Sequence, residues 1–233
     1  MLSLRPPRRI ARPRARQRGL SIMELMVGAA VGMIVVSGAV LLFAKNVSGS
    51  RMLLAETRLN QDLRNAADLV TRDIRRAGFW GNAILGTTAI GGTSVTTQNP
   101  YSQVSMPAAN EIAYRFSRDS ATDNNTLDAN EQFGFRLNDG ALQMQVGGSW
   151  TDVTDKSSVN ITTLTVTPTV TQISLGDTCP TVCGIGTPNC PTTTVRSYAV
   201  VLHGQSVRDA AVQRSLRSTV RVRNDQVAGA CPA

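Results

Sequence analysis

The hydrophobic pattern of the chain is dominated by one apolar run near its N-terminus. No charged side chain occurs between Leu25 and Ala44, a stretch of 20 residues. At about 1.5 Å per helical residue, this run is long enough to cross the roughly 30 Å hydrocarbon core of a bilayer. The pattern therefore predicts a membrane-spanning helix over residues 20–45.

A second helical pattern follows the apolar run. Apolar residues recur there at intervals of three and four, which places them on one face of a helix. They are Leu59, Leu63, Ala67, Val70, Ile74 and Ala77. Charged side chains cover the other faces, and Gly78 follows the last apolar position. We expect the helix to continue as an amphipathic segment over residues 46–78, with one side packed on a folded head and its end near Ala77.

The remaining pattern, in residues 79–233, predicts a head rich in antiparallel strands. Residues 82–109 are rich in Gly, Thr, Ser and Asn, which favours an extended loop with short strands. Alternating apolar and polar residues begin at Glu111 and resume on both sides of Asn138-Asp139-Gly140, which predicts a β-hairpin. Further strands are expected over 149–153, 159–173 with an interruption at Pro168, 195–202 and 218–223. The expected fold class is α+β, a long helix packed on an antiparallel sheet.

The positive charge of the chain is concentrated ahead of the apolar run. The formal net charge is +8. Seven arginines precede the run: Arg5, Arg8, Arg9, Arg12, Arg14, Arg16 and Arg18. Without them, 17 basic residues remain against 16 acidic ones, so a nucleic acid is not an expected partner. An arginine cluster before a membrane span is held on the cytoplasmic side, which directs the C-terminal head outward.

One carboxylate, Glu24, lies just inside the apolar region. An unpaired carboxylate in a bilayer costs on the order of 2.5–3.5 kcal/mol, so such groups usually have a partner. Cleavage between Gly19 and Leu20 would give Leu20 a free amine, and Glu24 would become the fifth residue, one helical turn away. The amine of a neighbouring copy could then neutralise Glu24 when helices stack. Glu24 is therefore predicted to be an assembly residue.

Two simpler interpretations of the apolar run are a signal anchor and an ordinary signal peptide. Both consist of a basic stretch followed by an apolar one. A weak signal-peptidase site is present at Ser37-Gly38-Ala39. Cleavage there would discard Glu24, and an ordinary signal peptide has no use for a carboxylate in its apolar region. The position of Glu24 therefore favours the assembly interpretation.

The string R-G-L-S-I-M-E-L-M-V around Gly19 resembles the class III leader of type IV pilins and type II secretion pseudopilins. The resemblance implies a pilin fold and a leader peptide over residues 1–19. It implies that a prepilin peptidase cleaves after Gly19 and that the new amine of Leu20 is methylated. It also assigns subunit docking to Glu24. Major pilins usually have Phe at the position of Leu20, whereas minor pilins accept other apolar residues.

Two later strings narrow the resemblance. R-D-I-R-R-A-G-F-W-G at residues 72–81 and T-V-R-V-R-N at residues 219–224 resemble minor pilins of the PilW type and the related J-type pseudopilins. The implied function is that of a minor pilin that helps to initiate a type IV pilus, forms part of its tip complex and serves adhesion and twitching motility. The implied partners are other minor pilins, the major pilin and a tip adhesin of the PilY type. The implied location is the inner membrane, with the head in the periplasm, and then the extracellular pilus.

Two other functions stay open from sequence. A minor pseudopilin of a type II secretion system shares the leader and the stem, and the scarcity of acidic loops that could bind calcium favours the pilus over it. A DNA-uptake receptor would need a basic stripe and strongly salt-dependent binding. The near-neutral charge of the chain beyond its leader argues against this receptor.

Four cysteines lie in the last third of the chain: Cys179, Cys183, Cys190 and Cys231. Three of them fall in a Cys-, Pro- and Gly-rich loop over residues 178–194. Outside the cytoplasm we expect disulfides, of which four cysteines allow three pairings that the sequence does not distinguish. The alternatives are free thiols and a zinc site. The C-x3-C-x6-C spacing with one distant histidine, His203, does not match the tight cysteine pairs of structural zinc sites.

Two further stretches carry candidate chemistry. Residues 123–131 are rich in side-chain oxygens suited to calcium, but the EF-hand order fails because Leu127 stands where a ligand should be, so we expect a solvated loop. The arginines at residues 72–76, with Phe79 and Trp80 after them, could form a nucleic-acid patch. We expect instead that they form the solvated face and end of the helix and that both aromatic rings pack under the head.

Motifs for catalysis are missing from the sequence. It has no nucleophile elbow, phosphate loop, HExxH motif or paired C-x-x-C motif, and His203 is its one histidine. A triad or a metal site built from several histidines would have to depend on that residue alone. We therefore expect a structural and interaction protein rather than an enzyme, without cofactor or metal.

Overall fold

The computed structural model describes Gly19 and residues 21–86, 98–119, 122–184, 186–187, 190–229 and 231–232. Most of the predicted leader, Leu20 and much of the expected loop after residue 86 lie outside these described residues. Contacts divide the chain into two compact units, Met1–Ser50 and Arg51–Ala233.

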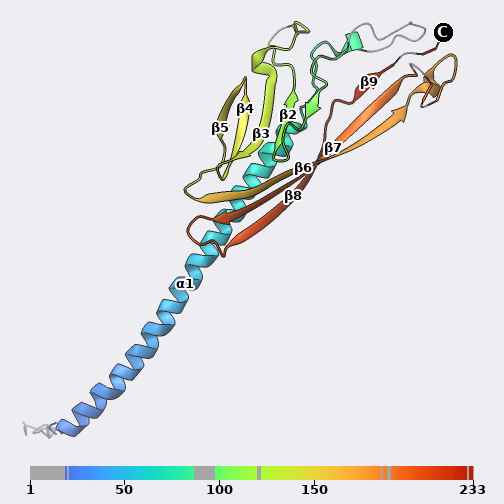
Figure 1. The fold of residues 1–233 in the computed structure, drawn as a ribbon. Coiled ribbons are helices and arrows are strands. Elements are labelled where there is room, and N and C mark those ends of the chain that lie inside the picture. The colour runs from blue at the N-terminus through green and yellow to red at the C-terminus, as the bar shows by residue number, and fades with distance from the viewer. Residues whose placement is uncertain are drawn as a thin grey trace, which may run out of the picture. The chain divides into compact units, whose positions relative to one another are not determined.

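One long helix, α1, spans Ile22–Ile74 (Figure 1). In the first unit its side chains are apolar around the whole circumference, and the described residues from Ser21 to Asn46 are exposed. The helix is long and apolar enough to cross a membrane. In the second unit the predicted stripe faces inward, and all six of its apolar residues are buried. The first half of the helix is thus exposed on all sides and the second half buries one face, because their sequence patterns differ.

The end of α1 lies three residues before the predicted position. The helix stops at Ile74, and the next residues form tight turns in which the Ala77 N–H donates to the Ile74 carbonyl at 3.0 Å. Gly78 then adopts a φ of 74°, which only glycine tolerates easily, and its N–H donates to the Arg115 carbonyl at 2.8 Å. The glycine therefore turns the chain away from the helix and ties it to the first sheet.

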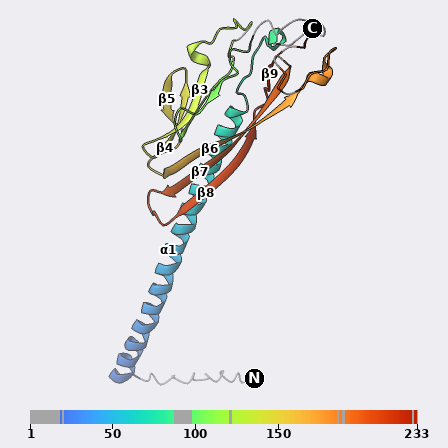
Figure 2. The same ribbon diagram turned by 45° about the vertical axis from the view of Figure 1, so that its right-hand side comes forward.

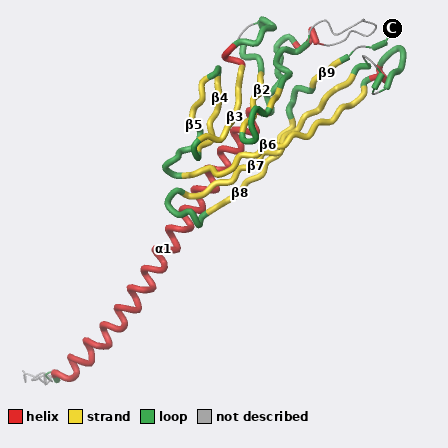
Figure 3. The backbone as a smooth tube through the Cα atoms, in the orientation of Figure 1, coloured by secondary structure: helices red, strands yellow, loops and turns green. Residues whose placement is uncertain are grey.

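The fold class is α+β, as predicted, but the head contains two antiparallel sheets where one was expected (Figure 3). The first sheet has the order β1 (Val104–Ser105), β2 (Glu111–Arg115), β3 (Gln132–Asn138), β4 (Ala141–Val146) and β5 (Ser149–Asp152). The second has the order β6 (Val159–Ser174), β7 (Thr192–Ser206) and β8 (Gln213–Arg221), with β9 (Gln226–Ala228) paired to the start of β7. Short 3-10 helices are η1 (Ala83–Gly86), η2 (Ala129–Glu131) and η3 (Gly176–Thr178).

The predicted hairpin is confirmed in the first sheet. β3 and β4 pair so that Asn138 faces Ala141 across the turn. The two residues between them, Asp139 and Gly140, have φ values of 48° and 72°. Positive φ at both central positions is the requirement of a type I′ turn, whose twist matches that of the strands.

The predicted interruption at Pro168 is wrong. β6 runs without a break through Pro168, which pairs with Tyr198 of β7. Proline lacks a backbone N–H and is tolerated in strands at a sheet edge, where that donor would face solvent. β6 has β7 as its neighbour on one side only, so its outer edge accommodates the proline.

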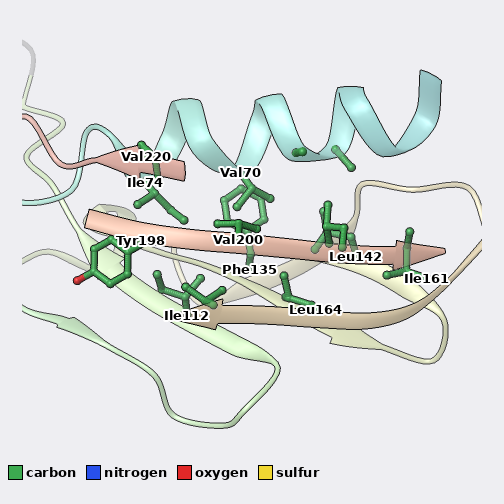
Figure 4. Packing of buried hydrophobic residues seen from close by; sticks show 14 of the residues in the cluster. Val70, Ile74, Ile112, Phe135, Leu142, Ile161, Leu164, Tyr198, Val200 and Val220 are labelled. Carbon is green, nitrogen blue, oxygen red and sulfur yellow. The ribbon is translucent and has the colours of Figure 1, made fainter. Parts of the chain in front are cut away.

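The core lies where α1, the first sheet and the second sheet meet. Figures 1 and 2 show β6, β7 and β8 side by side along the part of α1 that belongs to the second unit. In Figure 4, Val70 and Ile74 of α1 point toward Val200 of β7 and Phe135 of β3. All four side chains are almost completely buried. One apolar core therefore joins the amphipathic part of the helix to both sheets.

Candidate functional site

The predicted assembly residues lie at the N-terminal end of α1. Glu24 is in the first turn of the helix, next to the Leu25 N–H, which donates to the Ser21 carbonyl at 3.1 Å. The free N–H groups of a first turn carry partial positive charge, which favours a carboxylate there. No ion pair to Glu24 occurs among the described residues, and its side chain is exposed. Gly19 is exposed as well, whereas Leu20 lies outside the described residues.

The surface around Glu24 is apolar on every side of the helix. Large side chains from Ile22 to Phe43 are exposed on all faces, each by more than half of its area. A helix of this kind is stable when lipid or other apolar helices cover it. Glu24 is therefore the single charged group between Ile22 and Phe43, on a surface suited to burial, and burial would require a cation beside it.

The four cysteines form two disulfides that pack against each other. Cys179 is bonded to Cys231, and Cys183 is bonded to Cys190. The first bond joins residues 52 positions apart, while the second closes a short loop of 7 positions. Because β9 precedes Cys231 and pairs with β7 at Thr192 to Thr194, the long-range disulfide holds the C-terminal segment against the second sheet.

The oxygen-rich stretch 123–131 uses its carboxylates within the protein. Asp123 accepts hydrogen bonds from the Gly81 N–H at 2.9 Å, the Tyr101 hydroxyl at 3.0 Å and the Asn125 N–H at 2.8 Å. Glu131 is fully buried and accepts from the N–H groups of Arg118 and Asp128, both at 2.9 Å. Among the described residues, no group of three or more His, Cys, Asp or Glu side chains is placed to hold a metal ion. The stretch is thus a hydrogen-bonded loop that is anchored to the segment after α1.

Hydrogen bonds lower the pKa of the Asp123 carboxyl group. Burial alone would raise its pKa, but hydrogen bonds from the Ser117 side chain, from backbone N–H groups and from Tyr101 outweigh burial and hold the pKa below its ordinary value. Burial and the same carboxylate raise the pKa of Tyr101. The pKa of Asp123 is lower in the folded state than in the unfolded chain, where it is about 3.8, so the ionised carboxylate stabilises the folded state at pH values above 3.8. This contribution is lost as the pH falls through the pKa of the folded state.

The variant Asp123→Asn is therefore expected to lower the free energy of unfolding at pH 7 by about 1–3 kcal/mol, since buried donors lose a charged acceptor. Its stability should also fall less steeply than that of the wild type below about pH 4. Urea unfolding of the full chain in detergent at pH 7 and pH 3 measures both effects. Asp177→Asn, at an exposed position of η3, is the control. Identical pH dependence in the wild type and Asp123→Asn would contradict this role.

The expectation for the residues after α1 is only half correct. Trp80 is buried, with 4% of its surface exposed, and its indole N–H donates to the Asn125 side chain at 2.9 Å. Phe79, expected to pack under the head, is 48% exposed. Arg76 stacks over the Phe116 ring at 4.1 Å. Trp80 and Arg76 therefore pack at the helix end, whereas Arg72 and Arg75 are exposed, as expected for the solvated face.

His203 lies on the exposed face of β7, and its Nε2 is 3.5 Å from the Ser215 hydroxyl. In the described part of the chain no carboxylate is paired with this histidine. The pair sits in an open depression with Thr163 and Arg214, and Arg214 is bonded to Glu56 at 2.9 Å. This arrangement does not orient the imidazole as a general base.

Sequence reasoning missed one cluster of charged residues. Arg223 follows β8, and its N–H donates to the carbonyl of Arg75 at the end of α1, at 3.1 Å. Arg221 and Arg223 therefore lie beside Arg75, although about 150 residues separate them in the chain. From sequence, the arginines at residues 72–76 are expected to form the solvated face and end of the helix, and residues 219–224 carry only a resemblance. Local sequence carries no signal for their contact.

Comparison with known protein families identifies a family for most of the chain. The family model described as prepilin peptidase-dependent protein B matches residues 52–222. No curated protein matches the chain, and no solved structure does. The matched range begins after the apolar run and ends after β8, so it is independent of the Gly19 to Glu24 motif. The head and the N-terminal motif thus point separately to the same class of protein.

Proposed function

The chain belongs to the prepilin peptidase-dependent protein B family, and from this premise we propose that it is a minor pilin of a type IV pilus. In this role it contributes to the initiation of the filament and to its tip complex. The family supports a pilin-like or pseudopilin-like protein. The observation that carries the proposed assembly role is Glu24, a lone carboxylate on an exposed apolar helix, five positions after Gly19.

The proposed mechanism has two steps. A prepilin peptidase removes residues 1–19 and methylates Leu20, while the apolar part of α1 anchors the subunit in the inner membrane with its head in the periplasm. Glu24 then pairs with the terminal amine of a neighbouring subunit, which neutralises both groups as the helices bundle. The apolar surface moves from lipid to the packed helices without exposure to water. The reaction is performed on the chain, and we propose no catalytic role for it.

The proposed partners are other minor pilins, the major pilin and a tip adhesin of the PilY type. A minor pseudopilin of a type II secretion system is the alternative, because the same helix and the same family also suit that role. Identification of the subunits that co-purify with the chain separates the two. Pilins among them support the pilus, and secretion subunits support the alternative.

Processing provides the direct test of the proposal. We expect the intact mass of protein extracted from membranes to correspond to loss of residues 1–19 and gain of one methyl group on Leu20. Substitution of Gly19 by valine should leave the leader attached, because a bulky side chain replaces the glycine at the cleavage site. Gly28→Val, within the apolar run, is the matched control and should be processed normally. A wild-type protein that retains its arginine-rich N-terminus contradicts the proposal.

A further inference from the structure

The head is nearly neutral as a whole, but its charges are unevenly distributed. Six arginines lie where the end of α1 meets the chain that leaves β8: Arg72, Arg75, Arg76, Arg196, Arg221 and Arg223. Two aspartates, Asp73 and Asp225, lie among them. The rest of the second unit has 10 basic and 13 acidic residues. We call this cluster of six arginines and two aspartates the arginine end, and it is strongly positive while the remainder is negative.

An open cavity of about 460 Å³ lies at the arginine end. It is lined by Arg75, Arg221, Val222 and Arg223. The backbone under it is fixed, since the Arg223 N–H donates to the Arg75 carbonyl and the Val222 N–H donates to the Arg196 carbonyl at 3.0 Å. The three guanidinium groups therefore project from a rigid junction of helix and strand, which lowers the entropy lost when they bind a ligand.

Two of these guanidinium groups have no counter-ion. Arg221 pairs with Asp225 at 2.8 Å, but Arg75 and Arg223 form no ion pair with any described residue. The other carboxylate oxygen of Asp225 is buried and has no hydrogen-bond partner. Asp225 therefore already neutralises Arg221. Arg75 and Arg223 remain free to bind an anion in the cavity.

Arg196 adds positive charge behind the cavity. Only 7% of its surface is exposed, and it donates to the carbonyls of Ser102 and Asn224 rather than to a carboxylate. Its Nε has no hydrogen-bond partner among the residues that the structure describes. Because charges interact more strongly away from water, a buried cation of this kind raises the positive potential at the adjacent surface.

We propose that this cavity is a docking site for carboxylates on an acidic segment of a neighbouring subunit, an inference that rests on the proposed function. Guanidinium groups bind carboxylates through paired, charge-assisted hydrogen bonds. With three arginines among its four lining residues, the cavity suits one or two such groups. A long polyanion such as a nucleic acid would also meet the net negative remainder of the head. The 13 acidic residues in the rest of the second unit show that a head of this kind carries carboxylates that such a cavity could bind.

The test uses the full chain in detergent and a fluorescein-labelled glutamate-rich peptide, with binding followed by fluorescence anisotropy at low salt. The double variant Arg75→Gln/Arg223→Gln should weaken binding by about tenfold or more, because two charge-assisted contacts are lost. Arg58→Gln/Arg208→Gln removes the same charge from exposed arginines outside the cavity and should change the affinity by less than about twofold. All variants have the same N-terminus, so their differences report on the cavity.

Three results would overturn the docking site. The first is an equal loss of binding in both double variants, which indicates net charge alone. The second is equal binding of a glutamine-rich peptide, and the third is tighter binding of inorganic polyphosphate or an oligonucleotide than of the glutamate peptide. The assay is independent of processing: loss of specific binding in a correctly processed protein contradicts the docking site only, and a retained leader contradicts the proposed function only.

Discussion

Replacing Glu24 with glutamine is expected to leave the chain in the inner membrane but to reduce its incorporation into filaments at least about tenfold. Two unit charges 4 Å apart near a protein surface attract by about 4 kcal/mol, and about 1.4 kcal/mol corresponds to a tenfold change. Glutamine keeps the shape and removes the charge, so the amine of the neighbour would be buried without its partner. The ratio of the variant in sheared filaments to that in membranes, measured by immunoblot, reports the effect.

Glu56→Gln is the matched control for this variant. Glu56 also lies on α1, and its carboxylate pairs with Arg214 at 2.9 Å within the second unit. A partly exposed pair contributes about 0.2–1 kcal/mol to stability, so its loss should not affect assembly by more than about twofold. If Glu24→Gln subunits enter filaments as readily as the wild type, or if both variants assemble equally poorly, pairing between Glu24 and a terminal amine is wrong.

The sequence correctly predicted those parts of the fold that depend on interactions between residues close together in the chain. The stripe from Leu59 to Ala77 marks the buried side of α1 because side chains three and four positions apart share a helix face. The Asp139-Gly140 turn predicts the β3–β4 hairpin because few residues accept positive φ at both positions. In each case the signal and the structure occupy the same short stretch of chain.

The parts that sequence did not predict depend on contacts between distant residues. From sequence, Pro168 is expected to interrupt a strand. It does not, because β6 lies at a sheet edge, and the local sequence does not show this position. β9 has three residues, too few to show alternation, and it exists because it pairs with β7. The division of the strands into two sheets and the choice among three disulfide pairings are long-range in the same way.

The residues of the candidate site also divide into those predicted from local sequence and those that depend on contacts between distant residues. Gly19 and Glu24 were found from sequence because the proposed cleavage motif is short and linear and because a carboxylate is conspicuous in an apolar run. In the proposed mechanism the partner of Glu24 belongs to another molecule, so a single chain would not contain the complete site. The arginine cavity needed the fold, since Arg75 and Arg223 come together only when the end of α1 meets the chain after β8.

Removing the two disulfides separately is expected to give unequal losses of stability. In a chain-entropy description, the Cys179–Cys231 bond, which spans 52 positions, contributes about 4 kcal/mol, and the Cys183–Cys190 bond, which spans 7, about 2.5 kcal/mol. The longer bond restricts the unfolded chain more. Its removal also frees the C-terminal segment, so β9 should separate from Thr192–Thr194 more easily. Urea unfolding under non-reducing conditions measures both losses.

The paired serine variants Cys179→Ser/Cys231→Ser and Cys183→Ser/Cys190→Ser serve as controls for each other, since each removes two sulfur atoms from the same packed cluster. Amide hydrogen exchange distinguishes the two causes of a loss. If the longer bond acts as proposed, its removal increases exchange in β9 and in the start of β7, whereas removal of the shorter bond changes exchange mainly within the described residues between Cys183 and Cys190. Equal losses of stability with the same exchange pattern would show that packing of the sulfur cluster, rather than closure of the long loop, stabilises this part of the head.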